Sequence, residues 1–172
     1  LGCLQQINFF KPPVLNIGGL IYLYMKIDNK FYRTIWENKD YGDIDIIDQS
    51  FGHISEAVDI NKINSISNLW PNHPIDLHIM SYYPLKYLNN NFKNLNVIYF
   101  HIETKDNLND VYTKIVDLGA EPGIVLHAKN IYQDLSDIIN KFKHIMILSI
   151  ENPGTSGQSF IRESYDLIKR IN

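Results

Sequence analysis

The sequence has very little cysteine, with Cys3 the single one in 172 residues. A disulfide framework is therefore excluded, and we expect a reducing location such as the cytoplasm. Positive charge is not in excess, since 16 Lys and Arg stand against 19 Asp and Glu for a net charge of −3. The charge balance therefore gives no reason to expect nucleic acid as a partner.

Long hydrophobic runs are also missing. The apolar stretch at residues 14–24 is shorter than the ~20 residues that a membrane-spanning helix needs, so we expect no membrane association. The first methionine is Met25. We therefore expect residues 1–24 to be a leader with little structure, or sequence upstream of a start at Met25.

The whole chain has a hydrophobic content of 45% and a charged content of 20%, which are typical of one globular domain. Within residues 25–49, the β-forming run 31–36 and the alternating acidic and apolar run 43–47 predict a β-hairpin. From residue 60 onward, helical and strand patterns alternate, which predicts right-handed crossovers and a parallel α/β sheet. The expected strands are 75–80, 95–102, 123–126 and 144–150, and the expected helices are 60–69, 84–92, 108–118, 131–142 and 161–171.

Polar residues gather where these strands end. His78 lies near the end of the first, His101 and Glu103 end the second, and His127 ends the third. In a parallel array the carboxyl ends of the strands collect the chemistry, so we interpret these residues as one rim. A single histidine of this kind is more often a structural hydrogen-bonding residue, and that alternative stays open for each of them.

Imidazole is a common ligand for zinc and other divalent metals, and carboxylates can move a proton. Asp43, Asp45 and Asp48 supply candidate carboxylates before the array, and Asp76 and Glu103 lie within it. Asp43 and Asp45 share one face of their strand. The alternative is that these two form the solvated side of that strand.

The stretch Asn152–Phe160 contains two glycines between an apolar run and a helical pattern. A strand, glycine loop and helix in this order present backbone N–H groups to an anion, usually phosphate. An ordinary turn between a strand and a helix is the alternative.

Four segments carry a resemblance to a known family, and they are Asp76–Met80, Phe100–Glu103, Leu118–Leu126 and Asn152–Phe160. Together they resemble the ribulose-phosphate 3-epimerase family. That resemblance implies a (β/α)8 barrel that interconverts ribulose 5-phosphate and xylulose 5-phosphate, with a divalent metal, commonly zinc, and two aspartates that exchange a proton at C3 through an enediolate.

The resemblance implies roles for particular residues. His78 matches a metal-binding histidine at the substrate, and Asp45 would be the catalytic, metal-bound aspartate. His101 and Glu103 match a motif at the rim without a definite role. The substrate phosphate end would be bound by the loop residues Gly154, Thr155, Ser156 and Gly157.

Several features depart from the family pattern. Asp43 stands where the family has histidine, and the sequence ends after the sixth strand–helix unit, so we expect a partial barrel without strands 7 and 8 and weak or no activity. Residues 25–49 also resemble the opening hairpin of methylthioribose-1-phosphate isomerase, which would give Asp45 another ancestry. The alternatives to an enzyme are a non-catalytic fragment that binds a sugar phosphate or a partner, and a fused gene remnant. Open sheet edges would favour a homo-oligomer.

Overall fold

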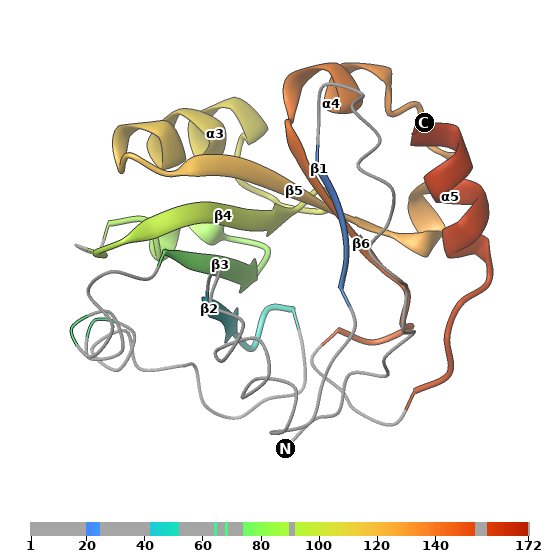
Figure 1. Cartoon of the computed structure of the whole chain (residues 1–172), viewed down its shortest axis with the longest axis horizontal. Coiled ribbons are helices and arrows are strands. Elements are labelled where there is room, and N and C mark those ends of the chain that lie inside the picture. Colours follow the sequence, from blue (N-terminus) through green and yellow to red (C-terminus); the bar gives the residue numbers. More distant parts are fainter. Residues whose placement is uncertain are drawn as a thin grey trace.

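A six-stranded parallel sheet forms the centre of the computed structural model, which describes residues 20–24, 42–51, 64, 68, 74–89, 92–153 and 158–171. The strand order is β1-β6-β5-β4-β3-β2, and each neighbouring pair is parallel (Figure 1). The strands are β1 (Leu20–Tyr24), β2 (Gly42–Ile47), β3 (Ile75–Met80), β4 (Leu95–His101), β5 (Glu121–His127) and β6 (His144–Leu148). The expected α/β parallel array is confirmed.

Helices cover one face of the sheet and join its strands. The helix α3 begins after Asn107, whose side chain accepts hydrogen bonds from the first-turn N–H groups, and it ends before Gly119, which has a φ of 79°. The helical segments are η1 (Pro84–Lys86), α3 (Leu108–Asp117), η2 (Ala128–Tyr132), α4 (Ser136–Lys141) and α5 (Glu163–Ile171).

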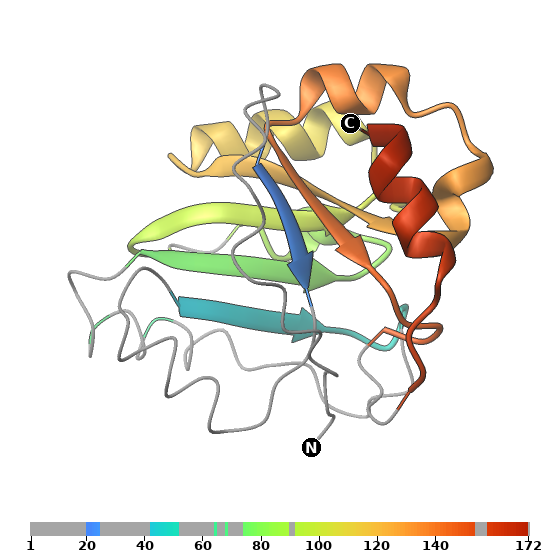
Figure 2. The ribbon, with the colours of Figure 1, turned by 45° about the vertical axis from the view of Figure 1, so that its right-hand side comes forward.

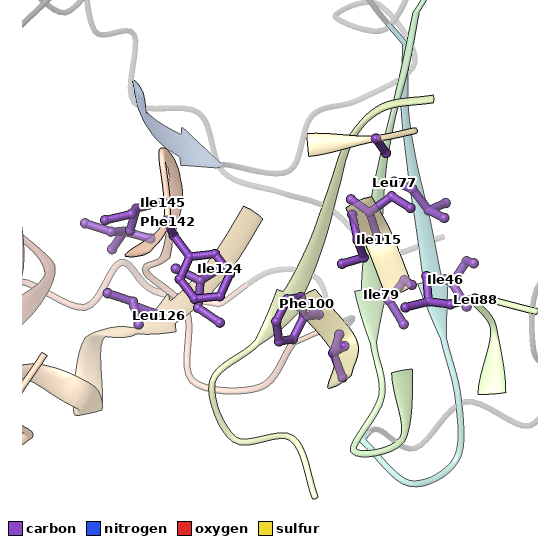
Figure 3. Packing of buried hydrophobic residues seen from close by; sticks show 14 of the residues in the cluster. Ile46, Leu77, Ile79, Leu88, Phe100, Ile115, Ile124, Leu126, Phe142 and Ile145 are labelled. Carbon is purple, nitrogen blue, oxygen red and sulfur yellow. The ribbon is translucent and has the colours of Figure 1, made fainter. Parts of the chain in front are cut away.

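The two faces of the sheet are used differently. The face toward the helices carries the main core, in which Ile46, Leu77, Phe100 and Ile124 pack against Ile115 of α3 and its neighbours (Figure 3). The other face carries a second cluster, formed by Val97, Tyr99, Val125, Met146, Leu148 and Ile150. Strands buried on both faces explain why these segments are nearly continuous apolar runs.

Two helices differ from the expected ones. Within the described part of the expected helix 84–92, which leaves out residues 90 and 91, the helical portion is the single turn η1, although Leu88 is buried and Phe92 packs against the core. The pattern at 131–142 is divided between η2 and α4. Gln133 is extended at the end of η2, and the side chain of Asp134 accepts hydrogen bonds from Ser136, which restarts the chain as a helix.

The first part of the chain is described only in short pieces. β1, at the end of the segment expected to be a leader, is a strand beside β6, and β2 forms the opposite edge of the sheet (Figure 2). β2 pairs in parallel with β3. The expected hairpin partner at residues 31–36 lies outside the described residues, as do residues 1–19. Across the described ranges, no helix is both long enough and apolar enough to cross a membrane.

Gly123 lies opposite Tyr99 in the register of β4 and β5, and a Cβ added there would lie 2.4 Å from the Tyr99 ring. We predict that Gly123→Ala lowers the free energy of unfolding by about 1–3 kcal/mol, because the ring must shift within a packed cluster. Urea denaturation measures this. The loss should shrink when Tyr99→Leu is already present.

Gly119→Ala is the matched control, since its Cβ would meet nothing within 4 Å and its cost arises from a φ of +79° alone. That cost should be unchanged by Tyr99→Leu. Equal costs for Gly123→Ala with and without Tyr99→Leu would contradict the predicted clash.

Candidate active site at the carboxyl ends of the strands

The parallel register of β2 with β3 brings Asp45 and His78 together. These two residues are register partners, and His78 is in turn the partner of Tyr99 on β4. His101 lies two residues beyond Tyr99, so it shares the same face of β4. The register thus places one side chain from each of three neighbouring strands in a row.

The row is a connected chain of polar groups. His78 Nδ1 lies 3.1 Å from Asp45 Oδ1, and His78 Nε2 lies 2.9 Å from His101 Nε2. On its far side His101 Nδ1 faces Glu103 Oε2 at 3.6 Å, and Glu103 Oε1 accepts a hydrogen bond from Asn130 Nδ2 at 3.1 Å. The structure thus brings Asp45, His78, His101 and Glu103 together in one row, while their roles at a site stay predictions.

Burial sets the charge of the inner part of this row, which is formed by His101 and Glu103. The His101 side chain is 1% exposed, and burial lowers its pKa to about 4 despite the opposing effect of Glu103. Burial alone would raise the pKa of Glu103, but the neighbouring His101 and Asn130 hold it below its ordinary value. At neutral pH, His101 is thus a neutral imidazole beside an ionised Glu103.

The outer end of the row, formed by Asp45 and His78, supplies donor atoms suited to a metal. Two ligands of a tetrahedral zinc lie about 3.3 Å apart when each bond is about 2.0 Å, so a separation of 3.1 Å between Asp45 Oδ1 and His78 Nδ1 fits two adjacent ligands. No group of three His, Cys, Asp or Glu side chains gathers for a metal within the part of the chain that the structure describes. For Asp43, which pairs in register with Asp76, only the backbone is described.

Asp48 has a structural role that the sequence did not indicate. Its carboxylate accepts hydrogen bonds from Ser50 Oγ at 2.5 Å, Ser81 Oγ at 2.7 Å and Tyr87 OH at 3.0 Å, and a further one from the Ser50 N–H at 2.9 Å. These bonds tie the chain after β2 to the chain after β3. Asp48 therefore fixes the end of the strand that carries Asp45.

His127 also has a structural role, as the alternative for each rim histidine allowed. Its Nε2 donates to the carbonyl of Ile150 at 2.6 Å, and its Nδ1 accepts from the N–H of Lys129 at 3.0 Å. Because both ring nitrogens are used, His127 ties the end of β5 to the end of β6. It does not join the row that contains His78.

The loop residues Gly154, Thr155, Ser156 and Gly157 lie outside the described residues, but the base of their loop is described. The side-chain Oε1 of Gln158 accepts from the N–H of Asn152 at 2.7 Å, and its Nε2 donates to the Asn152 carbonyl at 2.6 Å. One glutamine side chain therefore joins the two sides of the loop. Sequence reasoning missed this role, although Gln158 stood within the motif.

Comparisons with known proteins give the family of this chain. The family model of the "Ribulose-phosphate 3 epimerase family" matches residues 24–172, which include β2 and Asp45. The chain belongs to the ribulose-phosphate 3-epimerase family. The partial (β/α)8 barrel expected from the sequence is consistent with this family and with the parallel sheet. The likeness of residues 25–49 to methylthioribose-1-phosphate isomerase stays a prediction.

Several curated relatives bear the name ribulose-phosphate 3-epimerase. The protein from Aquifex aeolicus is 30% identical over 97 residues, which is 56% of this chain and 43% of that protein. The one from Escherichia coli K12 is 27% identical over 111 residues, covering 63% of this chain and 48% of that protein. The one from Serratia marcescens is 28% identical over 100 residues, covering 57% and 47%. The matches span somewhat less than half the length of these relatives.

The hydrogen bonds accepted by the Asp48 carboxylate lead to a stability prediction. We expect Tyr87→Phe to lower the free energy of unfolding by about 1.5–3 kcal/mol at neutral pH, because it removes a hydrogen bond to a buried carboxylate. Burial would raise the pKa of Asp48, but the hydrogen bonds from Ser50, Ser81 and Tyr87 hold it below its ordinary 3.8. Their contribution is therefore fully present above pH 3.8 and is lost as the pH falls through the lower folded-state pKa.

Urea denaturation over a pH series measures this difference between the wild type and Tyr87→Phe. Tyr132→Phe is the control, because Tyr132 is 88% exposed and its hydroxyl can bond to water. A Tyr87→Phe loss that stays constant through the acid range would contradict the role given to Asp48.

Proposed function

We propose that the strand-end rim is a sugar-phosphate site of the ribulose-phosphate 3-epimerase type, at which Asp45 moves the proton at C3 of a pentose 5-phosphate. The observation that carries the proposal is the contact between Asp45 Oδ1 and His78 Nδ1 at 3.1 Å, in a chain of this family. A metal site of this type needs Asp45 close to His78, so this contact favours the enzyme interpretation over a non-catalytic fragment.

The chemistry follows from the position of the two groups. The proton at C3 lies next to the C2 carbonyl of the substrate, so its removal gives a planar enediolate. Its return to the same face restores the substrate, and its return to the opposite face gives the epimer. A positioned carboxylate is a suitable base for this step. The Asp45 side chain is 21% exposed and the His78 side chain only 4%, so Asp45 is the member of the pair that a substrate can reach.

We also propose that Asp45 and His78 are two ligands of a divalent metal, zinc by analogy with the family. The spacing and chemistry of the two donor atoms support this, although a catalytic zinc usually has three protein ligands and the described residues provide two. When bound, such a metal would polarise the substrate carbonyl and stabilise negative charge on the enediolate oxygens.

The phosphate end of the substrate is assigned to the loop of Gly154, Thr155, Ser156 and Gly157. Support comes from the base of the loop, where the hydrogen bonds between Gln158 and Asn152 hold its two sides together. A loop held in this way can direct its backbone N–H groups at an anion.

The cytoplasmic location and self-association through the edges of the sheet stay predictions.

We predict that this 172-residue chain exchanges the C3 hydrogen of ribulose 5-phosphate with deuterium from D2O, even where net epimerisation is weak. Removal and return of a proton by one base on one face is enough for exchange. Asp45→Asn should reduce the exchange rate by about 10²–10⁴-fold, since it removes the base. Proton NMR of the sugar phosphate measures the loss of the C3 signal.

Asp166→Asn is the matched control, because Asp166 is an exposed residue of α5 that pairs with Lys169. Exchange that persists unchanged in Asp45→Asn would contradict the role of Asp45. Binding of the sugar phosphate without any exchange would contradict the enzyme proposal and support the non-catalytic binding protein.

Zinc binding is expected to depend on His78. We predict that His78→Gln lowers the zinc affinity by more than about 100-fold, since changes to groups that merely orient a metal ligand already cost 10–100-fold. Competition with a chromophoric chelator measures the affinity. His144→Gln is the control because His144 lies at the start of β6, at the opposite end of the strands. Equal zinc binding by His78→Gln and the wild type would refute the metal assignment.

A further inference from the structure

The row from Asp45 to Glu103 has one proton fewer than its contacts require. In each of its three contacts, two atoms that can carry lone pairs face each other: Asp45 Oδ1 and His78 Nδ1 at 3.1 Å, the two Nε2 atoms at 2.9 Å, and His101 Nδ1 and Glu103 Oε2 at 3.6 Å. Each contact is favourable only if a proton or another cation lies between its atoms. With one proton on each ring, the form in which a histidine binds a metal, the two imidazoles supply two protons for three contacts.

The contact between the two imidazoles must hold one of these protons. Its nitrogens are 2.9 Å apart, and the side chains of His78 and His101 are 4% and 1% exposed. Two lone pairs at this distance, shielded from water, would repel each other without compensation. The second proton must therefore lie at the Asp45 end or at the Glu103 end.

The inner end has the stronger need for that proton. His101 Nδ1 and Glu103 Oε2 are both buried and 3.6 Å apart, and neither has a hydrogen-bond partner at normal distance among the described residues, so each needs a proton between them. Glu103 is held in place from the β5 side, because Asn130 donates to its Oε1 and the Asn130 Oδ1 accepts from the N–H of His127. At the outer end, by contrast, Asp45 is partly exposed and can receive a cation from solvent.

We propose that Glu103 is a positioning residue that acts through His101 to hold His78 as the Nε2–H tautomer, which leaves the His78 Nδ1 lone pair directed at the Asp45 carboxylate. His101 then carries its proton on Nδ1, toward Glu103, and accepts the proton of His78 on Nε2. The outer pair becomes a cation-binding pair of one nitrogen and one carboxylate. This inference deepens the proposed function and rests on it for the identity of the cation, a divalent metal.

The substitution Glu103→Gln should reverse the tautomers. Because Asn130 Nδ2 donates to one side-chain atom of residue 103, the glutamine oxygen takes that place and its NH2 group faces His101 Nδ1. His101 must then accept there and donate from Nε2, so His78 accepts on Nε2 and carries its proton on Nδ1. That proton occupies the metal-binding position beside Asp45.

The experiment is 15N NMR of the histidine rings in the full chain at neutral pH, with His78 assigned from its missing signals in His78→Gln. We expect protonated Nε2 on His78 and protonated Nδ1 on His101 in the wild type, and the reverse for both in Glu103→Gln. The zinc affinity of Glu103→Gln, measured by chelator competition, should fall about 10–100-fold.

Glu121→Gln is the matched control, since Glu121 also contacts a histidine, His144 Nε2 at 2.8 Å, but at the start of β5. It should leave the His78 tautomer and the zinc affinity unchanged. A wild-type His78 protonated on Nδ1 would overturn the inference, and this spectrum does not depend on the folding of any variant. An unchanged tautomer and zinc affinity in folded Glu103→Gln would overturn it as well.

The outcomes for the inference and for the proposed function can be separated. If the tautomers reverse in Glu103→Gln while the wild type binds no zinc, the positioning role of Glu103 is upheld and the metal assignment fails. If zinc binds but C3 exchange is absent, the tautomer result still stands and the epimerase proposal fails.

Discussion

The parallel pairing of β2 with β3 is the constraint on which the candidate site depends. In a parallel ladder a shift of one residue moves every side chain of the strand to the other face. The observed register places Asp45 opposite His78, and a slip of one position would direct Asp45 into the core around Ile46 and Leu77. The hydrogen bonds from Ser81 and Tyr87 to Asp48 fix the same register just beyond the strand end. Site and fold are therefore specified by the same contacts.

Much of this fold could be predicted from the sequence, because strands buried on both faces have long apolar runs. The strand at 75–80 has the predicted bounds, and Gly119 ends α3 as expected. The spacing of apolar residues predicts which residues are buried better than it predicts how long a helix is. Leu88 of the expected helix 84–92 is buried, yet the helical portion of its described residues is a single turn, and the 131–142 pattern is interrupted where Asp134 bonds to Ser136 instead of continuing a helix.

The site was harder to predict than the fold because it depends on the pairing of strands and on hydrogen-bond direction. A histidine at a strand end has the same sequence signal whether it is structural, as His127 is, or part of the polar row, as His101 is. The role of Asp48 likewise depends on partners more than 30 positions away, Ser81 and Tyr87, which no local pattern reveals. Family membership supplied the expectation for Asp45, and geometry supplied its contact with His78.

The two hydrogen bonds between Gln158 and Asn152 have a consequence for how this region could diversify. They add to the backbone hydrogen bond from the Ile161 N–H to the Ser149 carbonyl at 2.8 Å, so the spacing of the two sides of the loop is fixed at its base and not by the residues between them. The base of the loop therefore does not depend on which residues lie between Asn152 and Gln158. Sequences of different length or charge could be accommodated there without disturbing β6, which would let ligand preference change independently of the sheet.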